Sequence, residues 1–221
     1  MDYRAVRQNM VENQIRPNRV TDAAVIAAMA DVPREMFVPD DVAGIAYVDE
    51  AAPLGDGRYL MEPLLLARIL QGAQISADDV VLSIGCGTGY AAAVLAKVAK
   101  AVVAVEVNNE LAEKAGALMV ELGIDNAVVI EDTLADGYAK QAPYDAIVFC
   151  GAVEEVPDAV LDQLAEGGRL VSVVAPAGQS GVAMGKAVVM QKFGAAVSSV
   201  ELFDAGTPLL PGFSKEKAFE F

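Results

Sequence analysis

Residues 79–96 read DVVLSIGCGTGYAAAVLA, and this stretch decides the fold. Residues 79–84 form an apolar run of strand length that passes directly into Gly85, Gly87 and Gly89. An alanine-rich segment typical of a helix follows at once. Glycines without side chains let a backbone turn sharply and approach a ligand closely at the carboxyl end of a strand. The stretch therefore predicts a β-strand, a ligand-binding turn and a helix in succession.

The same alternation of strand and helix continues from residue 78 to residue 176. Strands are expected at 101–107, 127–132, 144–150 and 169–176, and helices at 89–100, 108–123 and 156–168. Near-continuous Val, Ile and Leu runs are typical of parallel strands that are buried on both faces. The pattern predicts an α/β fold with a doubly wound parallel sheet, followed by an antiparallel hairpin over residues 186–205.

The first 75 residues have a different, mostly helical pattern. Apolar residues recur at helical spacing over 4–15 and 21–29, and Thr21 is the expected N-cap of the second segment. Residues 44–57 look like loops, and Pro63 opens another helix. We expect one domain over 1–221, divided into a helical and substrate-loop region (1–75), a ligand-binding core (76–175) and a hairpin with tail (176–221).

Composition limits the classes of partner. The chain has 16 Lys and Arg against 31 Asp and Glu, a net charge of −15, which disfavours nucleic acid as a partner. It is 54% hydrophobic, yet no apolar run reaches the roughly 18 residues that a membrane span needs. The amino-terminal residues lack the apolar stretch of a signal peptide. These observations predict a cytoplasmic protein with no membrane partner.

The absence of histidine excludes several kinds of site. With no His in the chain, Ser-His and Cys-His nucleophilic sites and His-ligated metal centres are ruled out. Cys86 and Cys150 are too few for a zinc site made of cysteines alone, so no metal is expected. We expect the two thiols to be small buried residues, although a redox pair at the ends of two neighbouring strands is an alternative.

The ligand-binding turn is followed by acids at the ends of the next two expected strands. A dinucleotide fingerprint needs glycine at the sixth position of the turn, which here is Tyr90. Glu106 ends the second strand and can accept hydrogen bonds from both ribose hydroxyls of an adenosine, while Asp132 ends the third. Each feature alone could be an ordinary turn. Together they favour an adenosine ligand without phosphates, S-adenosyl-L-methionine (SAM).

These residues carry a family resemblance. The segment VLSIGCGTGYAAAVLA resembles motif I of class I SAM-dependent methyltransferases. Over about residues 10–210 the chain resembles the protein-L-isoaspartate O-methyltransferase family. The resembling segments are 13–17 (NQIRP), 20–39, 46–57 (AYVDEAAPLGDG) and 142–174. The resemblance implies a Rossmann-like, mostly parallel sheet of seven strands, SAM as cofactor, and transfer of a methyl group to the carboxylate of damaged protein.

The resemblance also assigns the cofactor residues. Gly85 and Gly87 match the glycine turn, Glu106 matches the acid that binds ribose, and Asp132 matches the acid of the family's GDG segment. Motif I usually begins with an acid, and here Ser83 stands at that position. The cofactor-binding residues expected are Ser83, Gly85, Cys86, Gly87, Glu106, Val107, Asp132 and Thr133.

The acceptor loop departs most from the family. The family pattern G-x-G-x-T-I-S-x-P aligns with residues 55–63, GDGRYLMEP. Thr has become Tyr59 and Ser has become Met61, which cannot donate a hydrogen bond. Arg58 and the Tyr59 hydroxyl remain as donors. We therefore expect Met61, Arg58 and Tyr59 at the catalytic position, either as a new acceptor site or as a loop that has kept its shape and lost its donors.

Three functions follow from these residues. The first is methylation of an isoaspartyl carboxylate, which is already ionised at neutral pH and needs no general base. Catalysis then depends on aligning oxygen, methyl and sulfur and on excluding water. The second is a relative with a different methyl acceptor. The third is a SAM-binding protein without transfer activity, because Met61 replaces the loop serine. The oligomeric state stays open.

Overall fold

A computed structural model describes residues 1–179 and 181–213. Residues 180 and 214–221, which belong to the expected hairpin and tail, lie outside the described residues. The central sheet has seven strands in the order β5-β4-β3-β6-β7-β8-β9. Their bounds are β3 Val80–Ile84, β4 Ala101–Glu106, β5 Ala127–Glu131, β6 Tyr144–Val153, β7 Leu164–Val174, β8 Val182–Phe193 and β9 Ala196–Pro208. The predicted doubly wound fold is confirmed.

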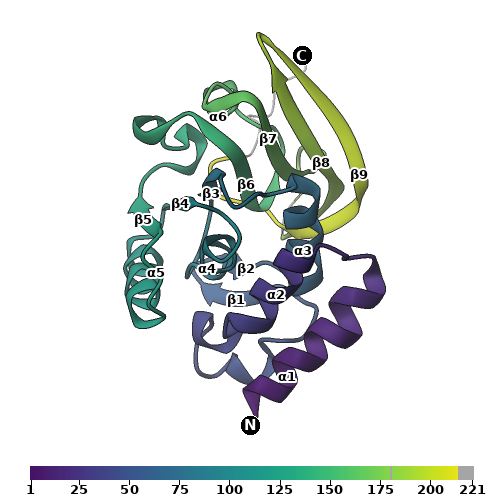
Figure 1. Cartoon of the computed structure of the whole chain (residues 1–221), viewed down its shortest axis with the longest axis vertical. Helices are drawn as coiled ribbons and strands as arrows, with labels where there is room; N and C mark the ends of the chain where they lie inside the picture. Colours follow the sequence, from purple (N-terminus) through teal and green to yellow (C-terminus); the bar gives the residue numbers. More distant parts are fainter. Residues whose placement is uncertain (180, 214–221) are drawn as a thin grey trace.

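The strands from β5 to β7 pair in parallel, and the last two do not. β8 runs antiparallel to β7, and β9 antiparallel to β8, so the predicted hairpin is confirmed. Figure 1 shows this hairpin extending along one side of the molecule. Strand order reverses between β4-β3 and β3-β6, which is where a doubly wound sheet forms a ligand crevice at its carboxyl edge.

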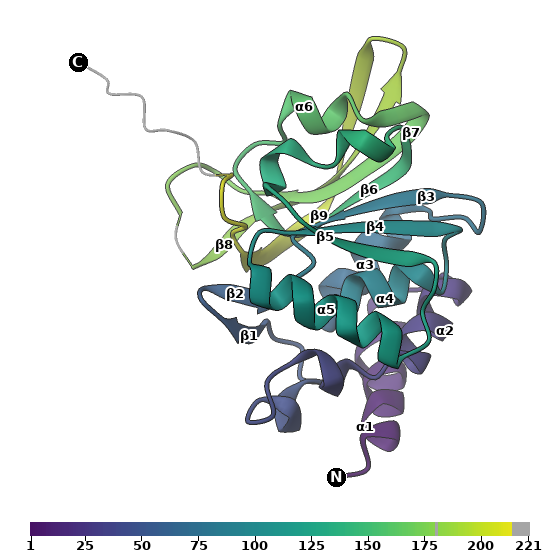
Figure 2. The ribbon, with the colours of Figure 1, turned by 90° about the vertical axis from the view of Figure 1, so that its left-hand side faces the viewer.

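Helices cover both faces of the sheet. In Figure 2, α3 (Pro63–Ala73), α4 (Tyr90–Ala96) and α5 (Asn109–Glu121) lie on one face, and α6 (Asp158–Leu161) lies on the other. Alternate strand residues divide between the two cores. Val81 belongs to the core under α3, α4 and α5, whereas Leu82 belongs to the core on the opposite face. This alternation is what a strand buried on both faces requires.

The amino-terminal segment packs beneath the α3 and α4 side of the sheet. It contains α1 (Tyr3–Met10), a π-helical turn (Val11–Ile15) and α2 (Ala23–Asp31). Thr21 is not the N-cap of α2. Asp22 holds that position, and its carboxylate accepts hydrogen bonds from the amides of Ala24 and Val25. The Thr21 amide is held instead by Gln71 of α3, at 2.7 Å from Oε1.

The helix expected over 156–168 is much shorter than predicted. It ends at Leu161, and β7 begins at Leu164, which pairs with Tyr144. Gly167 has a φ of +73°, and a Cβ on Gly168 would lie 2.8 Å from the carbonyl oxygen of Ala165. The two glycines therefore belong to an irregular start of the strand and do not end a helix.

Residues expected to be loop before Pro63 instead contain a small β-hairpin. β1 (Ala52–Gly55) pairs with β2 (Arg58–Leu60) in an antiparallel two-stranded sheet. Asp56 and Gly57 connect them with φ values of +49° and +70°. Asp-Gly is the dipeptide that a tight hairpin turn favours, since both central residues need positive φ. The hairpin positions the acceptor loop against the carboxyl edge of the main sheet.

No helix among residues 1–179 and 181–213 is long and apolar enough to cross a membrane.

Candidate functional site

The glycine turn lies where the sequence predicts, between β3 and α4. Gly85, Gly87 and Gly89 have φ values of +75°, +57° and +94°, in the region that residues with side chains rarely adopt. The turn is covered by other parts of the chain. A Cβ on Gly85 would lie 2.6 Å from Leu210, and one on Gly87 would lie 2.7 Å from Leu54. Glycine is therefore needed here both for conformation and for space.

Glu106 lies next to this turn at the end of β4, and it is fully buried. Its carboxylate accepts hydrogen bonds from three backbone amides: Gly87 at 2.7 Å, Val107 at 3.0 Å and Asn108 at 3.2 Å. Backbone donors of this kind stabilise the charged form of a carboxylate. The predicted ribose acid is thus held rigidly beside the glycine turn.

Arg58 supplies the remaining partners of Glu106. Its Nε lies 3.0 Å from Oε1 and its Nη2 lies 2.7 Å from Oε2, a bidentate ion pair in which both side chains are buried. Nη2 also donates to the carbonyl oxygen of Gly85 at 3.1 Å. The guanidinium therefore occupies the side of the carboxylate where ribose hydroxyls are expected to bind.

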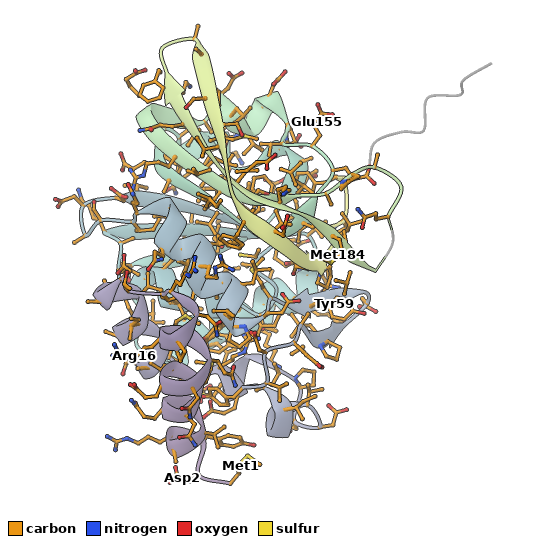
Figure 3. All side chains as sticks on the ribbon, turned by 90° about the vertical axis from the view of Figure 1, so that its right-hand side faces the viewer. Met1, Asp2, Arg16, Tyr59, Glu155 and Met184 are labelled. Atoms are coloured by element: carbon orange, nitrogen blue, oxygen red, sulfur yellow. The ribbon has the colours of Figure 1, made fainter. Side chains whose placement is uncertain are left out.

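The pleat of β2 separates Arg58 from its neighbour Tyr59. Successive side chains of a strand point to opposite faces, and along β2 Arg58 and Leu60 are buried while Tyr59 is exposed. Figure 3 shows Tyr59 on the outer side of the molecule, close to the β8–β9 sheet that carries Met184. The structure thus directs Arg58 to the expected cofactor side and leaves Tyr59 at the surface.

The third strand end is more open than the second. Asp132 and Thr133 are exposed, and the Thr133 amide donates to Asp132 Oδ1 at 2.8 Å. The Asp132 amide donates to the carbonyl oxygen of Glu106 at 3.1 Å, which ties the two strand ends together. Val107 is also exposed. These three residues lie at the exposed carboxyl ends of β4 and β5, and of the three only the Val107 amide is seen to contact the Glu106 carboxylate among the described residues.

Ser83 and the two cysteines are buried, Cys86 within the turn and Ser83 and Cys150 on the adjoining strands β3 and β6. The Ser83 and Cys150 side chains form a hydrogen bond, with Oγ and Sγ 3.3 Å apart, across the neighbouring strands β3 and β6. Both cysteines are free thiols. Burial raises the pKa of Cys150 to about 11 and that of Cys86 well above its usual value. Neutral, buried thiols fit the structural role expected of them.

Met61 and Glu62 complete the acceptor loop. Met61 is buried, and its carbonyl oxygen accepts a hydrogen bond of 2.7 Å from the buried Arg34. Glu62 accepts one of 2.9 Å from the hydroxyl of Thr207 at the end of β9. Burial raises the pKa of Glu62, against the lowering effect of its hydrogen bonds. The loop is therefore fixed by side chains on two distant elements.

Two spaces border this loop. A gap of only about 10 Å³ lies among Arg58, Met61, Cys150, Thr207 and Leu210, and about one water molecule needs that much room. A larger cavity of about 550 Å³ lies outside the loop. Its wall includes Tyr59, Glu62, Arg68, Phe203 and Asp204. The inner side of the loop is packed, and its outer side faces the cavity.

Sequence reasoning missed three residues of this region. Leu54 and Leu210 cover the glycine turn, and Thr207 holds Glu62. Leu54 belongs to β1, and the Asp-Gly turn that follows was a usable signal for its hairpin. Leu210 and Thr207 lie about 120 residues after the turn, and no local pattern links them to it. Leu210 reaches the turn because its amide donates to the carbonyl oxygen of Ala152 on β6, at 2.8 Å.

Comparison with known proteins identifies the family. The model of the protein-L-isoaspartate (D-aspartate) O-methyltransferase family matches residues 5–201. The chain belongs to this family. It is 40% identical over 173 residues to a protein-L-isoaspartate O-methyltransferase of Methanoculleus marisnigri, covering 78% of this chain and 79% of that one. A second relative, from Shewanella sediminis, is 41% identical over 172 residues, covering 76% of this chain and 69% of that one.

Solved structures show the same fold. A protein-L-isoaspartate O-methyltransferase superposes with a TM-score of 0.79 over 94% of this chain and 67% of that chain, at 24% identity. A putative family member from Plasmodium falciparum, in complex with S-adenosyl-L-homocysteine, superposes with a TM-score of 0.74 at 19% identity, covering 95% of this chain and 98% of that one. Family membership confirms the predicted resemblance and the prediction of a methyltransferase.

Proposed function

We propose that this chain transfers a methyl group from SAM to the side-chain carboxylate of isoaspartyl residues in damaged proteins. The observation that carries the proposal is the match of the family model to residues 5–201, together with the buried Glu106 beside the glycine turn. Both relatives described above bear the name of this activity, so nothing in them favours a different methyl acceptor. We place the reaction in the cytoplasm, with proteins or peptides as partners.

The residues present fit the cofactor by their chemistry. Glu106 is a carboxylate fixed by three amides, and it would accept the ribose hydroxyls. The turn at Gly85 and Gly87 offers backbone without side chains for the methionine portion, and Asp132 would accept from the adenine amino group. Ser83, Cys86, Val107 and Thr133 border these groups. Because Arg58 lies on Glu106 in this structure, its guanidinium would have to leave that position.

The reaction requires the protein to align the acceptor with the methyl group, and it requires no catalytic base. The cofactor supplies an activated methyl group on a sulfonium sulfur. The acceptor carboxylate is ionised at neutral pH and attacks directly, so no base is required. Tyr59, Met61 and Arg58 lie on the loop that must hold this carboxylate, and Met61 has no donor to offer. Arg58 has the strongest donor set for a carboxylate, since its planar group can bind both oxygens at once.

The proposal is tested by methyl transfer from radiolabelled SAM to a synthetic isoaspartyl peptide, with the product detected as methanol released by base. The same peptide with ordinary aspartate is the control for the acceptor. We expect label only with the isoaspartyl form, and much less label with the Glu106→Gln variant at a SAM concentration that just saturates the wild type. Equal labelling of the two peptides, or no labelling at enzyme concentrations where calorimetry shows the cofactor bound, would contradict the proposal.

A further inference from the structure

The Glu106 carboxylate cannot serve Arg58 and a ribose at the same time. Its two oxygens accept five hydrogen bonds, three from amides and two from Arg58. The three amides belong to the backbone of the turn and of the strand end, so they remain bound to the carboxylate when Arg58 moves. A carboxylate has about four lone-pair positions, and these are filled. The cofactor ribose and the guanidinium of Arg58 therefore compete for the same two oxygens.

Arg58 is seated firmly in this position. Its side chain is buried, it also binds the carbonyl oxygen of Gly85, and Leu210 lies against Gly85 on the same side. A buried guanidinium that simply leaves its partner would carry an uncompensated charge, which is strongly unfavourable. Release of Glu106 therefore requires a second anion that takes up the guanidinium. The transferred methyl group has such an anion as its acceptor.

Arg58 is itself part of the acceptor loop, between Gly57 and Met61. Arg58 and Met61 line one narrow gap. Met61 takes the position of the serine in the family's loop pattern. A bidentate carboxylate partner is offered by Glu106 in one state and by the acceptor in the other. The ion pair is kept in both states, so the buried charge is compensated throughout.

We propose that Arg58 exchanges Glu106 for the acceptor carboxylate, so that acceptor and cofactor bind with positive coupling. The inference rests on the proposed function, and it replaces the lost serine of the loop by an arginine that also controls access to Glu106. The coupling is reciprocal: acceptor binding raises cofactor affinity by the same factor as cofactor binding raises acceptor affinity. Couplings of this kind are typically about 5- to 150-fold.

The test measures affinity for S-adenosyl-L-homocysteine by calorimetry, with and without a saturating isoaspartyl peptide. A peptide in which an amide replaces the isoaspartyl carboxylate is the control for charge. In the wild type we expect the isoaspartyl peptide to raise the affinity about tenfold or more, and the amide peptide to leave it unchanged. In Arg58→Gln the affinity without peptide should be at least as high as in the wild type, and the peptide should no longer change it.

Two further variants keep the result interpretable. Arg58→Lys keeps the charge but loses the fork, and part of the coupling should remain. Arg169→Ala removes an ion pair at the opposite end of the sheet, and the full coupling should remain. Thermal unfolding of each variant shows that it is folded. Weaker binding in Arg58→Gln than in the wild type, or coupling that survives in this variant, would overturn the inference. Absence of binding in wild type and all variants would overturn the proposed function as well.

Discussion

Two arginine–carboxylate pairs lie at opposite ends of the sheet. Arg169 pairs with Asp79 at the amino end, and Arg58 pairs with Glu106 at the carboxyl end. Arg169 also donates to the carbonyl oxygens of Ala73 and Gln74, and so ties the end of α3 to β7 and to the turn before β3. Within residues 1–179 and 181–213, Arg58 donates to Glu106 and to the turn that is expected to hold the cofactor. The same chemical pair is a structural link at one end and, as we propose, an exchangeable one at the other.

The difference follows from the geometry of a doubly wound sheet. Ligands bind at the carboxyl ends of parallel strands, where the strand order reverses, so a charged pair there stands in the way of a ligand. At the amino end no such demand exists, and a pair can be used for stability alone. The comparison teaches that burial of an ion pair does not by itself show that it is structural.

Loss of each arginine should affect stability to a different extent. Arg58→Ala leaves Glu106 buried without its counter-ion and should lower the free energy of unfolding by about 3–5 kcal/mol. The Arg169 and Asp79 side chains are 21% and 10% exposed, so water can solvate what remains. For Arg169→Ala we expect a smaller loss of about 1–2 kcal/mol. Urea unfolding measures both, and a larger loss in Arg169→Ala would contradict the ranking.

Loss of each carboxylate should affect cofactor affinity to a different extent at the two ends of the sheet. Glu106→Gln should remove the charge from the two hydrogen bonds that we propose Glu106 makes with the ribose, and so weaken S-adenosyl-L-homocysteine binding about 100-fold, equivalent to about 2.7 kcal/mol. Asp79→Asn is the matched change at the other end and should leave affinity unchanged. Calorimetry at one temperature compares the two. If both variants lose affinity equally, the ends of the sheet do not differ in the way described.

Met61 tests whether the loop needs a hydroxyl. If Arg58 holds the acceptor, restoring the family serine should not raise turnover by more than about twofold. Met61→Ser should instead lower the free energy of unfolding by about 2 kcal/mol, because it empties buried volume. Initial rates with saturating isoaspartyl peptide, together with urea unfolding, measure both effects. A large gain in rate would mean that Met61 displaced a necessary donor.

The pair of Arg169 and Asp79 should make the free energy of unfolding depend on pH. Burial alone would raise the pKa of Asp79. Its hydrogen bonds with Ser76 and its pairing with Arg169 lower the pKa by more than burial raises it, so the pKa is below its ordinary 3.8. A depressed folded pKa stabilises the protein above the unfolded value and loses that contribution as pH falls through the folded value. The stability difference between wild type and Asp79→Asn should therefore shrink below about pH 4. A difference that grows on acidification would contradict this sign.

Glu62 provides the opposite case within the acceptor loop. Its pKa is raised above its ordinary 4.5, chiefly by burial. Because the folded protein binds this proton more tightly than the unfolded chain does, protonation of Glu62 adds to the free energy of unfolding at low pH. This contribution is lost as pH rises through the folded pKa. Glu62→Gln should therefore stabilise the protein at pH 7, by less than about 1 kcal/mol, and have almost no effect at pH 4. A variant less stable than wild type at pH 7 would show that the Thr207 contact outweighs burial.

The sequence predicts the framework of this site because that framework is local. Gly85 and Gly87 are needed by the turn itself, and Glu106 ends a strand whose apolar run is easily recognised. Thr21 shows where local patterns fail, since Asp22 is the better acceptor and Gln71 from α3 takes the Thr21 amide. The long helix expected over 156–168 fails for a similar reason, because pairing of Leu164 with Tyr144 outweighs helical propensity.

The orientation of Arg58 was beyond such reasoning. Its direction depends on the pairing of β1 with β2, which sets the face of each side chain, and on a carboxylate 48 positions later. The cover that Leu210 gives to Gly85 depends on the chain returning over β6 after the last strand. Contacts of this kind are decided by tertiary packing, and no periodicity within a short window records them.

The position of Arg58 with ligands bound tests the central claim most directly. A crystal structure of the protein with S-adenosyl-L-homocysteine and an isoaspartyl peptide shows which group lies on Glu106. We predict that the ribose hydroxyls occupy the two oxygens of Glu106 and that the Arg58 guanidinium binds the acceptor carboxylate. Arg58 still paired with Glu106 in that complex, with the ribose held elsewhere, would contradict the account.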